Sequence, residues 1–323
     1  MTQATLEIHL TDEDLTAALR EDVRAGLTAE PKTLPPKWFY DARGSELFEK
    51  ITELPEYYPT RTERALLERV VGEIAQVAQA EVLVELGAGS AAKTRLLLQA
   101  LTSGGPLKTY VPQDVSVAAL SASAEEVASE FPGLGVHGVV SDFTATLDNL
   151  PGGGRRMIAF LGGTIGNLVP QERAAFLGGI RDVLEPGEQL LLGAGLVIDP
   201  AVLVPAYDDA AGVTAEFNRN VLHVLNARLN ANFDPEKFAH VALWDAENEW
   251  IEMRLEAAEA MTVTIAELDL TVEFAAGEQL RTEISAKFRR EGLESELAAA
   301  GFATERVWTD PDDRFALVLA ERR

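Results

Sequence analysis

The stretch 82–89 reads Val-Leu-Val-Glu-Leu-Gly-Ala-Gly and precedes a segment of helical character that ends near Leu101. The apolar run predicts a buried strand, and glycine at 87 and 89 permits a tight turn into the helix. Gly87, Gly89 and Ala92 together satisfy the loose glycine-rich fingerprint of nucleotide-binding βα units. The stretch therefore predicts a turn that holds a phosphate or nucleoside group.

Strand-like and helix-like segments continue to alternate beyond this turn. The further strands are expected at 109–112, 135–140, 157–161 and 189–192, with helices between them. This alternation predicts an α/β fold with a parallel sheet. Open sheets of this kind bind ligands at the carboxyl ends of their strands, so the loops that follow these strands are candidate binding segments.

The C-terminal segment changes the direction of the sheet. We expect a helix from Ala286 to Ala300, then strands at 304–308 and 315–320 joined by the short turn Pro311-Asp312-Asp313. A short turn makes a hairpin, so the last strand lies antiparallel in an otherwise parallel sheet. A seven-stranded, Rossmann-like sheet with its final strand reversed is the architecture of class I methyltransferases.

Composition excludes several classes of function. The chain has 323 residues, and 28 Lys and Arg against 52 Asp and Glu give a formal charge of −24, which disfavours nucleic-acid partners. There is no cysteine, and the four histidines show no metal-ligand spacing, so no metal is expected. The longest apolar stretch, 190–198, is too short to span a membrane, and the N-terminus lacks signal-peptide character. We therefore expect a cytoplasmic protein without a membrane partner, and the high like charge favours a monomer.

Three features favour S-adenosylmethionine over a nicotinamide dinucleotide as the cofactor. They are the acid Glu85 inside the first strand, the pair Asp142-Phe143 after the third strand, and the reversed last strand. Asp114, at the end of the second strand, can bind both ribose hydroxyls, and Asp142 can accept from the adenine amino group. Lys93 begins a helix, where a cation calls for a carboxylate partner that the cofactor can supply. The residues alone leave open that Asp114 only caps a helix, that Lys93 lies on a helix surface, and that the chain is a dehydrogenase.

Several motifs, spread over nearly the whole chain, carry a more specific resemblance. They are Leu34-Pro-Pro-Lys-Trp-Phe-Tyr40-Asp41, Leu54-Pro-Glu-Tyr57-Tyr58-Pro-Thr60, Glu85-Leu-Gly87, Lys93-Thr-Arg95, Thr164-Ile-Gly-Asn167, Ala206-Tyr207-Asp-Asp-Ala-Ala-Gly-Val-Thr214, Phe217-Asn-Arg-Asn220 and Thr282-Glu283-Ile-Ser285. In these motifs the chain resembles the S-adenosylmethionine-dependent histidine Nα-methyltransferases of bacterial ergothioneine biosynthesis. The resemblance implies successive methylation of the α-amino group of L-histidine to the trimethylated betaine hercynine.

The resemblance also implies two domains. The expected boundaries are 61–197 with 286–323 for an S-adenosylmethionine-binding domain, and 1–60 with 198–285 for a substrate-binding domain. In the second domain we expect helices at 12–25 and 213–229 and strands at 250–255 and 261–270. The prolines at 55 and 59 predict extended backbone around Tyr57 and Tyr58.

The residues of the site follow from the same motifs. The resemblance implies cofactor contacts at Gly87, Lys93, Asp114, Asp142 and Phe143. It implies substrate contacts at Tyr57, Asn167, Tyr207, Met253, Glu283 and Ser285.

Within the substrate set, each residue has an implied role. Asn167 and Tyr207 would hold the carboxylate, while Tyr57 and Asn167 orient the amine. Glu283 and Ser285 would bind the imidazole, and residues two apart on an extended strand do face the same way. Tyr40 is the candidate catalytic residue, as a proton relay. The alternatives are the same chemistry on another amino acid, such as tryptophan, and a non-catalytic S-adenosylmethionine-binding protein.

Overall fold

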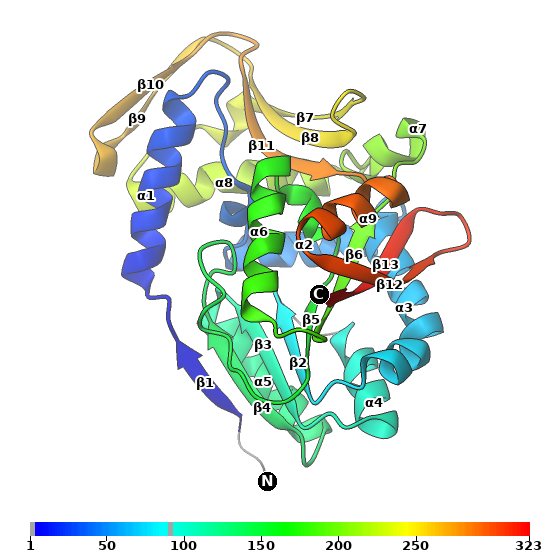
Figure 1. Cartoon of the computed structure of the whole chain (residues 1–323). Coiled ribbons are helices and arrows are strands. Elements are labelled where there is room, and N and C mark those ends of the chain that lie inside the picture. The colour runs from blue at the N-terminus through cyan, green and yellow to red at the C-terminus, as the bar shows by residue number, and fades with distance from the viewer. Residues whose placement is uncertain (1–3, 90–92) are drawn as a thin grey trace. The chain divides into compact units, whose positions relative to one another are not determined.

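The computed structural model describes residues 4–89 and 93–323. The chain divides into two compact units, each made of separate segments (Figure 1). The first unit comprises Met1–Thr11, Arg61–Leu196 and Phe288–Arg323, and the second comprises Asp12–Thr60 and Val197–Lys287. The placement of residues 1–11 differs from the expected boundary, because a strand in this segment joins the sheet of the first unit.

Among the described residues, the first unit contains an eight-stranded sheet in the order β1-β4-β3-β2-β5-β6-β13-β12. Its strands are β1 (Thr5–Ile8), β2 (Val82–Leu86), β3 (Thr109–Asp114), β4 (Gly135–Val140), β5 (Arg156–Phe160), β6 (Gln189–Gly195), β12 (Phe302–Thr309) and β13 (Phe315–Arg322). The pairs from β1 to β6 are parallel, whereas β13 is antiparallel to both β6 and β12. The expected α/β sheet with a reversed final strand is confirmed.

Helices cover both faces of this sheet. They are α3 (Tyr58–Ala78), α4 (Thr94–Gly104), α5 (Val117–Glu130), η2 (Thr164–Asn167), α6 (Pro170–Val183) and α9 (Arg290–Ala299). Helices α3, α4 and α5 share one apolar cluster with alternate strand residues such as Leu83 and Ala159. The next residue along β5, Phe160, points to the other face and contacts Phe176 of α6, with ring centroids 4.8 Å apart.

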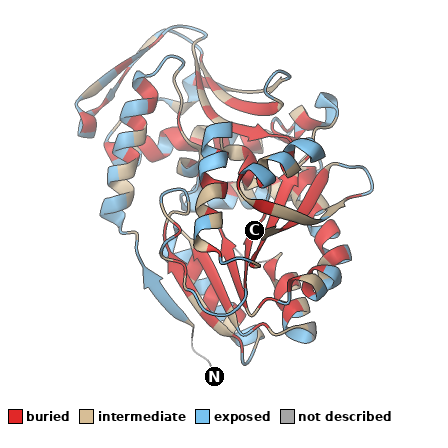
Figure 2. Cartoon of the chain, viewed as in Figure 1, coloured by how far each residue is buried: buried red, intermediate tan, exposed pale blue. Residues whose placement is uncertain are grey.

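Burial explains why most of these strands were predictable from the sequence. Every residue of β2 and β5 is buried, as expected of mainly apolar runs in a sheet covered on both faces (Figure 2). Strand β1 is exposed along its whole length and has no such run. It forms by pairing with β4, from Thr5 opposite His137 to Ile8 opposite Val140, and it was not predicted.

The second unit combines helices with a small antiparallel sheet. Its helices are α1 (Asp12–Thr28), η1 (Pro36–Phe39), α2 (Ala42–Glu53), α7 (Pro200–Leu203), η3 (Val204–Ala206), α8 (Val213–Leu229), η4 (Pro235–Lys237) and η5 (Ala266–Leu268). Its strands are β7 (Phe238–Asp245), β8 (Trp250–Ala257), β9 (Met261–Ile265), β10 (Leu270–Phe274) and β11 (Gln279–Ala286). Strand β8 lies between β11 and β7, and β9 pairs with β10 in a hairpin.

Two of the quoted motifs hold the helices of this unit together. Asn220 on α8 donates to the Phe39 carbonyl oxygen at 3.0 Å and to Asp41 Oδ1 at 2.8 Å. Asp41 caps α2 by accepting from the Gly44 N–H, and a Cβ at Gly44 would overlap the Phe39 carbonyl oxygen. These contacts fix the start of α2 against α8, and they require glycine at 44.

Three local predictions were wrong. Strand β11 pairs with β8 as far as Ala286, so helix α9 begins at Arg290 and not at Ala286. The segment 261–270 is not one strand, because η5 and Asp269, with φ of 47°, reverse the chain between β9 and β10. Helix α3 begins at Tyr58 rather than after an extended segment, since proline is tolerated in the first turn of a helix.

No helix in the described ranges combines the length and the apolar character that crossing a membrane requires.

Candidate functional site

The turn after β2 keeps the form that the glycine pattern predicts. Gly87 and Gly89 have φ of 69° and 50°, in the left-handed region that favours glycine. The N–H groups of Gly87 and Ala88 donate to the Gln113 carbonyl oxygen at 2.9 and 3.0 Å, which ties the turn to β3. Both glycines are exposed, so a ligand can approach their backbone. Ala92, the third position of the fingerprint, lies outside the described residues.

Asp114 connects this turn to the next one. Its Oδ2 accepts from the Gly89 N–H at 3.1 Å, and its Oδ1 accepts from the Ser116 N–H at 3.0 Å. The N-cap of α5 is Ser116, whose Oγ accepts from the Ala119 N–H, so Asp114 does not serve as the cap. A carboxylate has about four lone-pair positions, and two hydroxyl donors can still bind Asp114.

Asp142 and Phe143 follow β4 at the same edge of the sheet. Asp142 Oδ1 accepts from the N–H and the hydroxyl of Thr144, at 2.8 and 2.6 Å. The Phe143 ring contacts the rings of Phe160 and Phe176, with centroids 5.3 and 5.7 Å away. A Cβ built on Gly87 would lie 3.5 Å from the Phe143 ring, so these two predicted cofactor residues are neighbours.

Lys93 has a protein partner that was not predicted. Its ammonium pairs with Glu63, whose side chain is fully buried in α3. The other oxygen of Glu63 accepts from the Gly162 N–H at 2.7 Å, and a Cβ at Gly193 would overlap this carboxylate. An ammonium has three hydrogens, so Lys93 can bind a ligand carboxylate while it keeps Glu63. Glu63 lies 30 residues before Lys93, and no spacing in the sequence connects them.

Glu85 lies behind the turn. Its two oxygens accept from the hydroxyls of Thr94 and Tyr110, the latter at 2.6 Å. Burial raises the pKa of this carboxyl to about 7, against the opposing effects of the two hydroxyl donors and of Lys93. Glu85 therefore joins β2, β3 and α4 behind the turn.

In the second unit, β8 and β11 bring three predicted substrate residues together. Glu283 is directly opposite Met253 in the register of these strands, after an irregularity between Arg281 and Glu283. Ser285 follows two residues later on β11, and Met253 is only 2% exposed. Cross-strand partners lie on the same face of a sheet, so Met253 and Glu283 form neighbouring parts of one surface.

Tyr207, Ser285 and Lys287 form a cluster of hydrogen bonds. The Tyr207 hydroxyl lies 2.8 Å from Ser285 Oγ, and Lys287 Nζ donates to both oxygens, at 2.8 and 2.7 Å. Lys287 is 7% exposed, and its ammonium is 4.9 Å from the centre of the Tyr207 ring. Sequence reasoning missed this lysine, although 283, 285 and 287 are alternate positions of one extended segment.

Aromatic rings from α2 and from the turns before α2 and α3 form a chain of contacts that ends at Tyr207. The Tyr57 ring is 6.2 Å from both the Tyr207 and the Phe48 ring, and the Tyr40 ring is 5.6 Å from Phe48. Desolvation, with Glu283 and neighbouring tyrosines adding to it, raises the pKa of Tyr57 and of Tyr40 well above the ordinary tyrosine value. Desolvation also raises the pKa of Tyr207, although its bond with Ser285 opposes this. These phenols are neutral at physiological pH.

A polar network supports Tyr207 and β11 from behind. His240 Nε2 lies 2.8 Å from the Tyr207 backbone oxygen, and Asn218 Nδ2 lies 2.8 Å from His240 Nδ1. This pairing assigns the ring proton to Nε2, and burial lowers the pKa of His240. The Thr282 hydroxyl donates to Asn218 Oδ1 at 2.6 Å. Helix α8 thus positions both Tyr207 and the strand that carries Glu283.

Asn167 differs from the other predicted substrate residues in its location. It ends the short helix η2, which follows Gly163 with φ of 71° after β5. It belongs to the first unit, whereas Tyr40, Tyr57, Tyr207 and the residues of β8 and β11 belong to the second.

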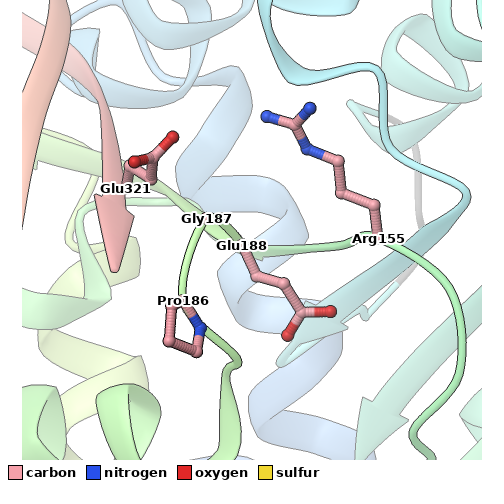
Figure 3. A pocket seen from close by; sticks show the side chains of 5 residues that line it. All are labelled: Arg155, Pro186, Gly187, Glu188 and Glu321. Carbon is pink, nitrogen blue, oxygen red and sulfur yellow. The ribbon is translucent and has the colours of Figure 1, made fainter. Parts of the chain in front are cut away.

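A hollow on the opposite edge of the large sheet does not include any predicted site residue. Arg155, Pro186, Gly187, Glu188 and Glu321 line it (Figure 3). These residues lie at the starts of β5 and β6 and near the end of β13, at the amino ends of the parallel strands. Ligands of such sheets bind at the carboxyl ends, where the turn at Gly87 lies.

Comparisons with known proteins find one matching family model and several similar relatives. A family model described as a histidine-specific, SAM-dependent methyltransferase matches residues 19–322. The histidine N-alpha-methyltransferase of Mycolicibacterium smegmatis is 52% identical over 318 residues, covering 98% of this chain and 99% of that protein. The protein of the same name from Mycobacterium tuberculosis is 51% identical, covering 97% of this chain and 98% of its own length. The ergothioneine biosynthesis protein 1 of Neurospora crassa is 30% identical over 91% of this chain and 34% of its own length.

Proposed function

The chain belongs to the histidine-specific, S-adenosylmethionine-dependent methyltransferases, and from this we propose that it methylates the α-amino group of L-histidine three times to give hercynine. This is the first step of ergothioneine biosynthesis. The observation that carries the choice of substrate is the surface on β8 and β11, where Glu283 faces Met253 and Ser285 follows on the same strand. A carboxylate and a hydroxyl there match the two nitrogens of an imidazole ring.

The first unit holds the cofactor in this proposal. S-adenosylmethionine, when bound, supplies a methyl group on a positively charged sulfur. Gly87 gives access to the backbone, Asp114 binds the ribose hydroxyls, and Asp142 with Phe143 binds the adenine. Lys93 binds the carboxylate of the cofactor, with Glu63 keeping its ammonium in place. The fit of these residues rests on the accessible glycine turn and on the free lone-pair capacity of Asp114.

The second unit orients histidine. Tyr207, together with Asn167, binds the substrate carboxylate. Because the Tyr207 hydroxyl is 2.8 Å from Ser285 Oγ, Ser285 is at the carboxylate end of the pocket and meets the ring nitrogen nearer the α-carbon. Glu283 is two residues away, about 6.6 Å along an extended strand, and accepts from the farther ring N–H. Met253 packs against the ring beside Glu283.

The reaction needs a neutral amine whose lone pair faces the methyl group, so positioning and removal of water supply most of the acceleration. Tyr57 and Asn167 orient the amine. Tyr40 and Tyr57 are neutral phenols, so they relay the ammonium proton towards water but do not take it up as anionic bases. The rings of Tyr40, Phe48 and Tyr57 also suit the methylated ammonium that develops, by cation–π attraction.

The remaining parts of the proposal concern partners and location. The charge of −24 opposes self-association and nucleic-acid binding, so the chain acts as a monomer on a small molecule. The absence of cysteine fits a reducing cytoplasm.

Mass spectrometry of the purified chain with S-adenosylmethionine and each of the twenty amino acids tests the reaction. We expect histidine alone to gain one, two and then three methyl groups. Methylation of another amino acid, such as tryptophan, would retain the cofactor assignment and remove the imidazole assignment of Glu283 and Ser285. No methylation of any amino acid would leave a non-catalytic S-adenosylmethionine-binding protein.

A further inference from the structure

Lys287 is a buried lysine that none of the roles above uses. Burial lowers the pKa of its ammonium, and the nearby Tyr58 and Glu283 oppose that effect. It is the residue after β11, and its backbone N–H donates to the Glu249 carbonyl oxygen at 2.8 Å. Its ammonium faces the Tyr207 ring and donates to two hydroxyls that the proposed function assigns to the substrate. Burying a charged group costs folding free energy. We therefore ask what function the hydrogen bonds of Lys287 serve.

The three polar groups form a closed triangle. The nitrogen of Lys287 lies 2.8 Å from the Tyr207 hydroxyl and 2.7 Å from the Ser285 hydroxyl, and the two hydroxyls are 2.8 Å apart. An ammonium only donates, so it occupies one acceptor position on each oxygen. One of the two hydroxyl hydrogens joins Tyr207 to Ser285. Without substrate, the other hydrogen points out of the triangle. With histidine bound, the Tyr207 hydrogen turns to the substrate carboxylate, and the Ser285 hydrogen then points to the ring.

We propose that Lys287 is a positioning residue that makes the Tyr207–Ser285 pair a hydrogen-bond donor, so that the pocket selects the neutral form of the substrate's ring. This inference rests on the proposed function. The ring nitrogen at Ser285 accepts a hydrogen bond, and the other ring nitrogen carries the proton that Glu283 accepts. An imidazolium, which has a proton on both nitrogens, leaves the outward hydroxyl hydrogen without an acceptor.

The charges at the two ends of the segment 283–287 support this selection. Glu283 alone favours a cationic ring, because a carboxylate stabilises a neighbouring positive charge. Lys287, four residues further along the same segment, carries the opposite charge to Glu283. Its positive charge therefore disfavours a positively charged ring. The other titratable groups around the cluster are Tyr40, Tyr57, Tyr58 and Tyr207, with His240 against the Tyr207 backbone. They are present in every variant that differs only at 287, so the ratio of variant to wild type isolates the lysine.

The test is calorimetric binding of histidine to the full chain at several pH values from 5.5 to 8.5. S-adenosylhomocysteine, which has no methyl group to transfer, is present throughout. For the wild type we expect affinity to fall as pH decreases through the imidazole pKa of about 6.5. For Lys287→Met we expect at least tenfold weaker binding at pH 8, and a ratio to wild type that approaches one at pH 5.5. A structural role alone would weaken binding by the same factor at every pH.

Two further variants keep the outcome interpretable. Lys287→Gln restores a hydrogen-bond donor without the charge. We therefore expect its histidine affinity to be within about threefold of wild type at pH 8. As pH decreases, its affinity should fall less than that of the wild type. If Lys287→Met does not fold, this variant carries the test. Lys237→Met removes an exposed lysine that pairs with Glu259 in the same unit, and should change nothing.

Wild-type affinity in Lys287→Met, or a ratio that is constant with pH, would overturn the inference. Failure of the wild-type chain to bind histidine at all would overturn the proposed function itself.

Discussion

The two units arrange their proposed ligand contacts in different ways. In the first unit, Gly87, Asp114 and Asp142 lie where buried parallel strands end, and local turns orient them. In the second, Tyr207, Glu283 and Ser285 depend on contacts between segments that lie far apart in the sequence, such as Tyr207 with Ser285 78 residues later. The contacts in the first unit depend on where the strands of the sheet end. The contacts in the second unit depend on close packing between distant segments. The expected effects of substitutions differ accordingly.

The largest effect is expected from a pair of helical glycines, one in each unit. Gly44→Ala in α2 places a methyl group on the Phe39 carbonyl oxygen and close to Asn220. We expect a loss of about 3 kcal/mol in the free energy of unfolding, because backbone must move. Gly72→Ala in α3 meets nothing within 4 Å and should gain about 1 kcal/mol. Chemical denaturation of both variants measures the difference, and equal stabilities would contradict the close packing of α2 against α8.

The second test separates the two ligands. Glu283→Ala removes the acceptor for the ring N–H and should weaken histidine binding roughly thirtyfold, or about 2 kcal/mol. S-adenosylmethionine binding should change less than twofold. Calorimetry with each ligand alone measures both, and Glu259→Ala, at an exposed ion pair, is the control. Equal losses for the two ligands would remove Glu283 from the substrate pocket.

The converse substitution is in the first unit. Asp114→Asn keeps the shape but loses the charge that we propose accepts from the ribose hydroxyls, so we expect S-adenosylmethionine affinity to fall about tenfold. Histidine binding without cofactor should be unchanged. Asp148→Asn, at an exposed acid of the same unit, provides the matched control. Unaltered cofactor affinity in Asp114→Asn would mean that this carboxylate only holds the glycine turn.

The smallest expected effect concerns pH. Burial raises the pKa of Glu85 from 4.5 to about 7 in the folded chain, so the folded state binds a proton more tightly than the unfolded one. Its contribution to stability is complete below pH 4.5 and is lost as pH rises through 7. Between pH 6 and 8 the wild type should lose about 1 kcal/mol relative to Glu85→Gln. Chemical denaturation at several pH values measures this difference. If the free energies of unfolding of the two proteins changed equally with pH, Glu85 would not titrate in this range.

The fold was predictable where local pattern and burial coincide. The strand 82–86 and the helix 213–229 were placed at their observed ends, because the first is apolar except for Glu85 and the second has a regular helical pattern. Strand β1 has no pattern of its own and exists through pairing with β4, 132 residues away at Thr5 and His137. The start predicted for α9 failed because Ala286 suits a helix locally but pairs with Trp250.

The candidate site residues also differ in whether a local sequence pattern predicts them. Gly87, Asp114 and Asp142 are predictable from the ends of the strands alone. The substrate residues came from the family motifs, and only the spacing of Glu283 and Ser285 supported them independently. Glu63 and His240 were missed because their roles depend on contacts with Lys93 and Tyr207, 30 and 33 residues away.

Strand β13 lies between β6 and β12, yet it follows the whole of the second unit in the chain. During synthesis, β6 is complete about 120 residues before the start of β13 is made. At about 5 to 20 residues per second, the ribosome needs roughly 6 to 24 s to cover that distance. For this interval the growing chain carries a strand of the central sheet with one edge unpaired, and such an edge invites pairing with other chains. The segment Val197–Lys287 of the second unit therefore lengthens the period in which this edge of the nascent sheet stays unpaired.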